Sequence, residues 1–280
     1  MSDSLSYLIS LYAGTAGANS PLLDALYGSG SSSSATDPVE ALRTAEQTET
    51  KQVAATAQQP AAQQAIAQFT KAVQSAKSVD QLLANPAVLN VLLTANGMSD
   101  QIGYTALASK VLTSNLSDPD SLANTVTDAR WKTLAQTYNF AVNGLVSIQT
   151  PKVLAVIANG YAQSLWASSQ DSITPGLANA LYFKSQASSI ASVDQILGDQ
   201  TLRTVVTTAL GVPAQIALQD IGAQEQAIAS RLDITKFQDA GFVQSFAERY
   251  LIANNSNSSV PPSASGDLTS LAVQARDLLV

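Results

Sequence analysis

The chain has 280 residues, of which 46% are hydrophobic, 12% are charged and 6% are aromatic, and its net charge is −7. This length and apolar content predict one large or two medium domains with a true hydrophobic core. The acidic balance, together with the lack of any basic run, argues against a phosphate-binding surface, so we expect no nucleic-acid partner.

The sequence contains no cysteine and no histidine. This excludes disulfides, thiol nucleophiles and cysteine-based metal sites, and it removes the commonest general base and transition-metal ligand. The charged fraction is about half of that in ordinary soluble proteins. Two interpretations stay open for such a surface: it is buried against partner proteins, or it reflects the compositional habit of the genome.

The opening segment lacks targeting signals. The first basic residue of the chain is Arg43, whereas a secretory signal begins with positive charge. No apolar run approaches the about 20 residues that span a bilayer. We therefore expect a soluble protein without membrane insertion that does not use the general secretory route. Export by a machine that needs no such signal stays open.

Helical patterns follow one another along the chain, and no strand-type alternation reaches a convincing length. Segment 1–27 opens with an amphipathic stripe, and GSGSSSSAT in segment 28–36 has the composition of a flexible linker. Proline after a capping residue predicts helix starts at Pro38 and Pro86, and Gly97 predicts a left-handed helix end. Ser99 is expected to open a helix that runs through Leu112. The stripe in the first segment consists of Leu5, Leu8, Ile9 and Tyr12.

One stretch occurs twice. SVDQLLANPAVLNVLLTANG begins at Ser78 and SVDQILGDQTLRTVVTTALG begins at Ser192, 114 positions later. At a similar offset Phe69 aligns with Phe183, and DARW, which begins at Asp128, aligns with DAGF. Because helix breakers and aromatics stay in register, we interpret the pattern as a tandem duplication of a helical unit. Each matched residue has a structural role as cap, core residue or helix end, so the repeat predicts architecture rather than a site.

The chain ends in a second amphipathic stripe, formed by Leu268, Leu271, Ala275 and Leu278 and capped by Asp267. Helices as short as the two terminal ones are marginal alone in water and need a surface to pack on. The predicted fold is therefore all-α, with two tandem, similar multi-helix lobes flanked by short amphipathic terminal helices on flexible linkers. The predicted order is an N-terminal amphipathic segment (1–27), a linker (28–36), lobe 1 (37–147), lobe 2 (148–254), a linker (255–266) and a C-terminal amphipathic helix (267–280).

No catalytic, metal or cofactor motif emerges. There is no nucleophile elbow and no phosphate-binding loop, and Asp118 and Asp120 fit a turn around Pro119 better than a cation site. Arg130-Trp131 and Arg249-Tyr250 are the nearest to special residues. An arginine beside an aromatic can anchor a partner, but the favoured interpretation puts the aromatic in the core and pairs the arginine with a local acid. The other expected core aromatics are Tyr138, Phe140, Tyr161, Trp166, Tyr182 and Phe183.

The repeated stretches, together with DARWKTLAQTYNF and FQDAGFVQSFAERY, resemble the family filed as domain of unknown function 1217 over residues 37–254. The resemblance implies an all-helical fold and a role in flagellar structure or assembly, since members occur largely in alphaproteobacteria and often lie among flagellar genes. It carries no enzymatic activity, and so no catalytic residue, to this chain.

The resulting hypothesis is a non-enzymatic structural component of the bacterial flagellum, exported through the flagellar channel. It would contact other flagellar proteins, or copies of itself, through the terminal stripes. The alternative is a cytoplasmic assembly factor or export chaperone that uses the same ends.

Overall fold

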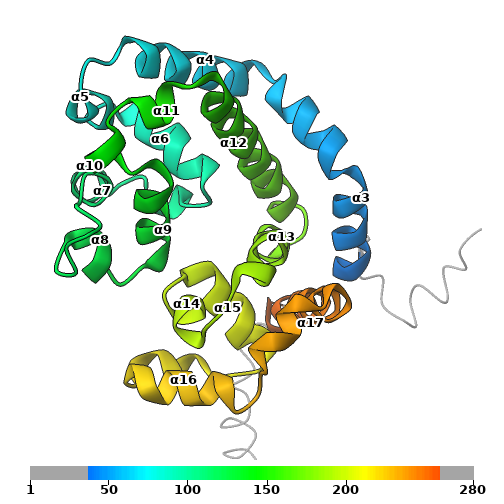
Figure 1. Ribbon diagram of the computed structural model, residues 1–280. Helices are drawn as coiled ribbons and strands as arrows, with labels where there is room; N and C mark the ends of the chain where they lie inside the picture. Colours follow the sequence, from blue (N-terminus) through cyan, green and yellow to red (C-terminus); the bar gives the residue numbers. More distant parts are fainter. Residues whose placement is uncertain (1–36, 259–280) are drawn as a thin grey trace, which may run out of the picture. The chain divides into compact units, whose positions relative to one another are not determined.

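The computed structural model describes residues 37–258, and all regular elements in that range are helical (Figure 1). The first elements are α3 (Pro38–Ala57), α4 (Pro60–Ser75), α5 (Val79–Leu83), α6 (Pro86–Ala95), η1 (Ser99–Gln101), α7 (Thr105–Leu112), α8 (Leu122–Thr125), α9 (Ala129–Tyr138), α10 (Phe140–Asn143) and α11 (Val146–Gln149). They are followed by α12 (Pro151–Asp171), α13 (Leu177–Gln186), η2 (Ala187–Ser189), α14 (Val193–Leu197), α15 (Gln200–Ala209), η3 (Ala214–Leu218), α16 (Ile221–Ala229), η4 (Ile234–Gln238) and α17 (Ala240–Ser258).

The all-α prediction is confirmed for this part of the chain. None of its helices is both long and apolar enough to cross a membrane. The predicted terminal stripes lie outside the described residues, as do segments 1–27, 28–36 and 267–280. Residues 255–258, which are assigned to the second linker from the sequence, instead belong to α17, since this helix continues to Ser258.

Local signals explain most helix starts. Asp37 accepts a hydrogen bond from the Val39 amide, and Pro38 occupies the first helical position of α3, where its missing N–H costs nothing. Asn85 caps α6 in the same way, and α4 begins with Pro60. The helix expected from Ser99 is wrong in detail. Residues 99–101 form only a 3₁₀ turn, and α7 starts at Thr105 because Gly103 interrupts the helical run.

The two copies of the repeated stretch have the same local geometry. Ser78 and Ser192 have φ −147° with ψ 158° and 159°, and each hydroxyl accepts a hydrogen bond from the amide three residues later. Gly97 and Gly211 end α6 and α15 at φ 72° and 63°. The amide after each glycine donates to the carbonyl five residues back, at 2.9 and 2.8 Å, which satisfies orphan carbonyls of the helix end.

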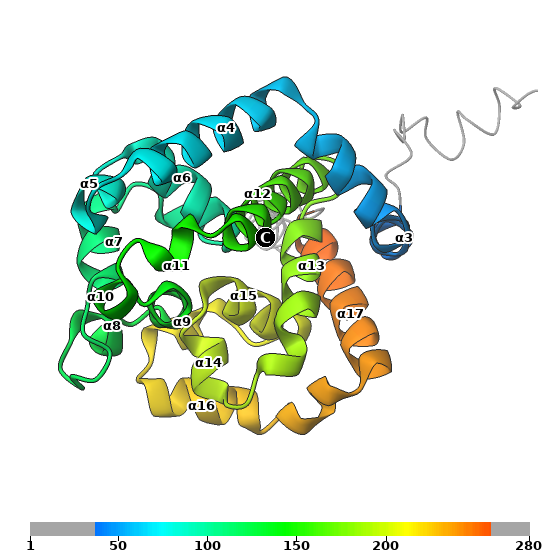
Figure 2. The ribbon, with the colours of Figure 1, turned by 45° about the horizontal axis from the view of Figure 1, so that its top comes forward.

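Two hydrophobic clusters hold the helices together. The first core extends from Phe69 to Tyr161 and takes side chains from α4 to α11 and from the start of α12. The second core combines α13 to α17 with the end of α12 and with α3. Figures 1 and 2 show α12 lying between the two groups of helices. This helix contributes Leu154, Ile157 and Tyr161 to the first core and Ala162 and Trp166 to the second.

Helix α3 differs from its expected place. Its position in the sequence predicts that it belongs to lobe 1, yet its residues Leu42, Ala45 and Val53 are buried in the second core. It packs against α12, α13 and α17 (Figure 2). Lys184 of α13 hydrogen-bonds to Glu46 of α3, and Arg43 donates to Glu248 of α17 at 3.0 Å. Apolar burial over three helices therefore outweighs proximity in sequence as the determinant of where α3 packs.

Candidate functional site

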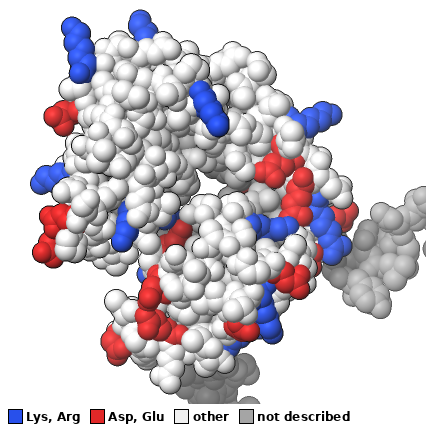
Figure 3. Space-filling model, in the orientation of Figure 1, with Lys and Arg blue, Asp and Glu red and all other residues white. Residues whose placement is uncertain are grey.

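A cavity of about 590 Å³ lies between the two cores and is lined by residues of both. Met98 and Leu134 belong to the first core, whereas Trp166, Ile190 and Leu202 belong to the second. Figure 3 shows the surface hollowed between the two groups of helices, and most of that face carries neither acidic nor basic side chains. Its size lies in the range of small-molecule sites, and we call it the inter-core cavity.

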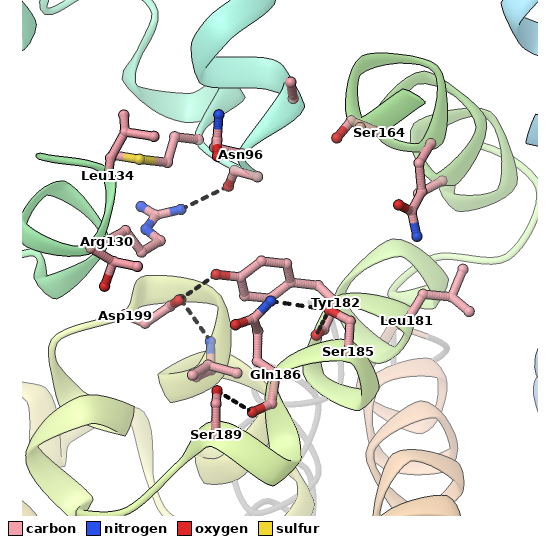
Figure 4. Close-up of a pocket in the computed structure, with 18 of the residues that line it drawn as sticks. Asn96, Arg130, Leu134, Ser164, Leu181, Tyr182, Ser185, Gln186, Ser189 and Asp199 are labelled. Atoms are coloured by element: carbon pink, nitrogen blue, oxygen red, sulfur yellow. Dashed lines mark hydrogen bonds between the residues drawn. The ribbon is translucent and has the colours of Figure 1, made fainter. Parts of the chain in front are cut away.

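One wall of the inter-core cavity is held by Arg130 of α9. Its guanidinium donates to Asp100 at 2.8 Å and to Asp128 at 2.7 Å. It also donates to the Gly97 carbonyl at 3.1 Å, the bond drawn from Arg130 in Figure 4. All five of its N–H groups are used, because Nε also bonds Asp128 and Nη1 also bonds Asp100. Arg130 therefore fixes the chain around Gly97, which the αL geometry alone would leave less constrained.

Burial and pairing act in opposite directions on the ionisation of this cluster. Burial disfavours the charged guanidinium, but the hydrogen bonds to Asp128 and Asp100 outweigh it and raise the pKa of Arg130. Burial likewise opposes ionisation of Asp100, yet hydrogen bonds from Arg130 and Gln101 leave the pKa of that carboxyl lowered. Both shifts favour the charged forms of Arg130 and Asp100, so neither of these two groups is tuned to exchange a proton near neutral pH.

The opposite wall carries Tyr182 of α13, whose hydroxyl donates to Asp199 at 2.7 Å (Figure 4). Asp199 is only 4% exposed, and its other oxygen accepts the amides of Thr201 and Leu202 at the start of α15. Burial, reinforced by the charge of Asp199, raises the pKa of Tyr182. Both groups are therefore structural: the phenol stays neutral and the carboxylate caps a helix.

The walls that carry Arg130 and Tyr182 are in direct contact with each other. A Cβ added to Gly97 would lie 2.8 Å from the Tyr182 ring, so only glycine allows this approach. The Ala129 amide donates to the Gly198 carbonyl at 2.9 Å, which is a direct backbone link between the two halves. On the far side, Gly160 of α12 approaches the Ala95 carbonyl so closely that a Cβ would lie 2.6 Å from its oxygen. These close contacts constrain the distances between the helices that surround the cavity.

One lining residue carries a buried polar atom that lacks a partner among the described residues. The indole N–H of Trp166 forms no hydrogen bond to any described residue, although the side chain is only 2% exposed. A buried donor without an acceptor costs about 1–3 kcal/mol, so its persistence calls for an explanation. The core position that the sequence predicts for Trp166 is confirmed, but no signal in the sequence shows that its donor would be left unpaired.

The other singled-out residues are placed as follows. Trp131 is 1% exposed, and Arg130 pairs with local acids, as expected. Tyr250 is core as well, but the expectation that Arg249 pairs with an acid is wrong, since it is exposed and forms no ion pair within residues 37–258. Asp118 accepts the amide of Asp120 in a turn, as expected. The core aromatics Tyr138, Phe140, Tyr161 and Phe183 are buried, whereas Tyr182 is half-buried at the cavity.

All of the predicted interface residues lie outside the described part of the chain. They are Leu5, Leu8, Ile9, Tyr12, Leu268, Leu271, Ala275 and Leu278. Within residues 37–258, no group of three or more acidic side chains is arranged to hold a metal ion.

These observations define a class of protein: an all-helical body with two hydrophobic cores, a cavity between them, and hydrogen-bonded polar groups around Arg130 and Asp199 in the cavity walls. The family model described as protein of unknown function (DUF1217) matches residues 95–243, more than half of the chain, so the chain belongs to this family. A crystal structure of a protein from Agrobacterium tumefaciens has a similar fold, with a TM-score of 0.67 and 27% identity over 76% of this chain and 91% of that chain. The sequence matches no protein of established, curated description.

Proposed function

We propose that this protein is a non-enzymatic structural component of the bacterial flagellum. In this proposal it is exported through the flagellar channel and assembles through its two terminal segments with flagellar neighbours or further copies of itself. The observation that carries the proposal is membership of the family, taken together with the flagellar setting that the resemblance of the sequence implies. The lack of cysteine throughout the chain suits passage through a narrow channel in an unfolded state.

The state of the ionisable groups favours a non-enzymatic role. Acid–base catalysis needs a group whose pKa lies near the working pH. In the inter-core cavity the shifts of Arg130 and Tyr182 go the other way, since both pKa values are raised from values already far above neutrality. Asp199 is engaged by Tyr182 and by two backbone amides. The chain has no histidine to supply the missing function.

The body of this structural protein, in our proposal, arose by tandem duplication. The matched caps at Ser78 and Ser192 support it, as do the matched helix ends at Gly97 and Gly211. Phe69 and Phe183, which the repeat aligns, are both fully buried. A duplicated helical unit gives a rigid body that displays its two ends for assembly, which is what an axial or axial-associated component needs.

Truncation and fractionation test the proposal together. Purified hook–basal bodies and filaments should contain the full chain, and deletion of residues 2–14 or 267–280 should remove it from them while the circular dichroism of the body is retained. Leu271→Ser should weaken incorporation, whereas Leu218→Ser, the same change at an 89% exposed position of the body, should not. Normal incorporation of both truncated chains would defeat the assembly mode.

The alternative, a cytoplasmic assembly factor or export chaperone, predicts a different distribution. The protein would then stay in the cytoplasmic fraction and be absent from purified flagella. That result would overturn the structural role and leave the terminal segments as the place where an export substrate is held.

A further inference from the structure

We propose that Asn143 is a modification site, at which the side-chain amide is lost spontaneously and aspartate or isoaspartate takes its place. The site is independent of the inter-core cavity and of where the protein assembles. The sequence contains three Asn-Gly pairs, at 96–97, 143–144 and 159–160. Glycine favours the reaction because it places no Cβ beside the reacting backbone nitrogen. The structure constrains two of these pairs strongly and the pair at 143–144 only weakly.

The reaction needs no reagent other than water. The backbone nitrogen of Gly144 loses its proton to base and attacks Cγ of Asn143. A bond forms between the two atoms, which closes a succinimide ring, and Nδ2 takes up a proton and leaves as ammonia. Water then opens the ring at either of its carbonyls, which gives aspartate or isoaspartate. Because the attacking nitrogen must first leave its own hydrogen bond, local structure decides which pair reacts.

Asn143 lies in a weakly held part of the chain. It is the last residue of α10, a helix of a single turn, its side chain is exposed, and it forms no side-chain hydrogen bond to residues 37–258. One hydrogen bond, from the Gly144 amide to the Phe140 carbonyl at 3.0 Å, holds the attacking nitrogen. Gly144 itself has φ 54° and ψ −141°, and open space surrounds the position that a Cβ would take.

The segment around Asn143 is anchored only at its ends. Phe140 is 3% exposed and Ile148 is fully buried, but no residue from 141 to 147 is buried. A single helical turn is marginal without packing, and segments with few buried contacts open at a small cost in free energy. The turn of α10 therefore opens more readily than the two cores, and each opening releases the Gly144 nitrogen for attack.

The pair at 96–97 is held by its own side chain and by its neighbours. Nδ2 of Asn96, the group that would leave, donates to the Leu92 carbonyl at 2.7 Å and to the Tyr138 hydroxyl at 3.2 Å. The Gly97 carbonyl accepts a hydrogen bond from Arg130, which is almost completely buried. Movement of this pair into the geometry of attack would break all of these hydrogen bonds, so we expect it to react slowly.

The pair at 159–160 shows that exposure alone does not decide reactivity. The side chain of Asn159 is exposed, but its backbone lies near the middle of α12, a helix of 21 residues that contributes to both cores. Buried Ile157 and Tyr161 flank the pair, and Gly160 lies against the Ala95 carbonyl. Release of the Gly160 nitrogen requires α12 to unwind inside the body, which costs far more free energy than the opening of one surface turn.

The reaction changes the charge of an apolar surface. No charged residue occurs between Lys132 and Lys152 in the sequence, and Val142 and Val146 are 76% and 71% exposed. Loss of the amide from Asn143 adds a negative charge beside these valines. Isoaspartate also adds a carbon to the backbone, which disrupts the turn of α10. The modified chain therefore presents a different surface from the newly made chain at a place where apolar contact with another molecule is possible.

Peptide mapping of the full chain by mass spectrometry tests the proposal, because trypsin places the three pairs in separate peptides, 78–110, 133–152 and 153–184. The folded chain is incubated near neutral pH for several weeks and then digested at mildly acidic pH, where the reaction is slow. We expect Asn143 to lose its amide at least about tenfold faster than Asn96 or Asn159, with isoaspartate among the products.

The unfolded chain supplies the matched comparison. In guanidinium chloride the three pairs should react at similar rates, since each has glycine after asparagine. Asn143→Gln should remove the product from peptide 133–152 and leave the other two rates unchanged, with circular dichroism as the check on folding. The proposal is overturned if Asn143 stays intact in the folded chain, if Asn96 or Asn159 reacts as fast, or if the unfolded chain shows the same preference. Product that persists in the Asn143→Gln peptide would come from Asn139 and would overturn it too.

Discussion

The two halves of the body share their helix caps but differ in what fills the space between helices. In the first half, Arg130 bridges to Asp100 from a position that is only 7% exposed. The repeat aligns Arg130 with Gly241 and Asp100 with Ala214, so the second half lacks both partners of the pair. Its interior instead contains a cluster of phenylalanines, in which the rings of Phe183, Phe237 and Phe246 lie 5.2–5.5 Å apart.

The difference indicates that Arg130 and Asp100 are exchanged together, whereas Asp128, the other partner of Arg130, is aligned with Asp239 and stays acidic. Removing one partner leaves an uncompensated charge, whereas replacing both partners by neutral residues that pack well costs little. Caps behave otherwise, because each acts alone on its own helix. The serine cap is the same in both halves, and Asn85 is replaced by Asp199, which caps α15 equally well. The contrast between paired and solitary interactions can be measured at aligned positions of one chain.

The largest expected effect is on the two aligned phenylalanines. Phe69→Ala and Phe183→Ala each empty a fully buried position, and each should lower the free energy of unfolding by about 3–5 kcal/mol. Urea denaturation followed by circular dichroism gives the values. Equal losses would support equivalent roles in the two cores, and a small loss at either position would break the comparison.

Next in size is the ion pair of the first half. Arg130→Met should lower the free energy of unfolding by about 3 kcal/mol, because the guanidinium gives up its hydrogen bonds to Asp100, to Asp128 and to the Gly97 carbonyl. Arg249→Met, at the exposed arginine without an ion pair in the described range, is the matched control and should change stability by less than about 0.5 kcal/mol. The double variant Asp100→Ala with Arg130→Gly copies the second half and should recover part of the loss. If the double variant loses more free energy of unfolding than the two single variants lose together, Arg130 and Asp100 do not act as a pair.

The helix-ending glycines differ in their surroundings, which provides a further test. Gly211→Ala meets open space and should cost about 1 kcal/mol for its left-handed backbone alone. Gly97→Ala must also displace the Tyr182 ring and should cost about 2–3 kcal/mol. Thermal unfolding of both variants checks the order, and Gly97→Ala combined with Tyr182→Ala separates the ring contact from the backbone cost. Equal losses of stability for the two glycine variants would show that the Tyr182 ring moves away from residue 97 at little cost.

The smallest expected effect is on acid stability. The folded-state pKa of Asp100 is lowered, so the stability it contributes is fully present above its unfolded pKa of about 4 and is lost as the pH falls through the folded value. The double variant Asp100→Ala with Arg130→Gly should therefore lose less stability than the unmodified chain between neutral and strongly acidic pH. Urea midpoints across that range measure the difference, and parallel curves would contradict it.

Local interactions account for what the sequence predicts well. Asp37, Asn85 and the two serine caps act within three residues, and Gly97 acts on its own helix end, so each leaves a readable trace in the sequence. The buried aromatics were expected for the same reason, since hydrophobic spacing along a helix marks its core face.

Contacts between distant segments account for what the sequence does not predict. Arg130 and Asp100 are thirty positions apart, and Tyr182 and Asp199 are seventeen apart, so no periodicity joins them. The inter-core cavity depends on how α6, α9, α12 and α13 pack, which the order of the helices does not determine. The unpaired donor of Trp166 follows from that packing and is invisible in a hydrophobic stripe.

The placement of α3 bears on the order of events during folding. This helix is the first described element to leave the ribosome, yet its partner α17 is the last, and the hydrogen bond from Arg43 to Glu248 spans 205 positions. The first core contains no residue of α3, so its helices can collapse on one another while α3 waits. The second core can form completely only after α17 has been synthesised, because it needs side chains from both α3 and α17.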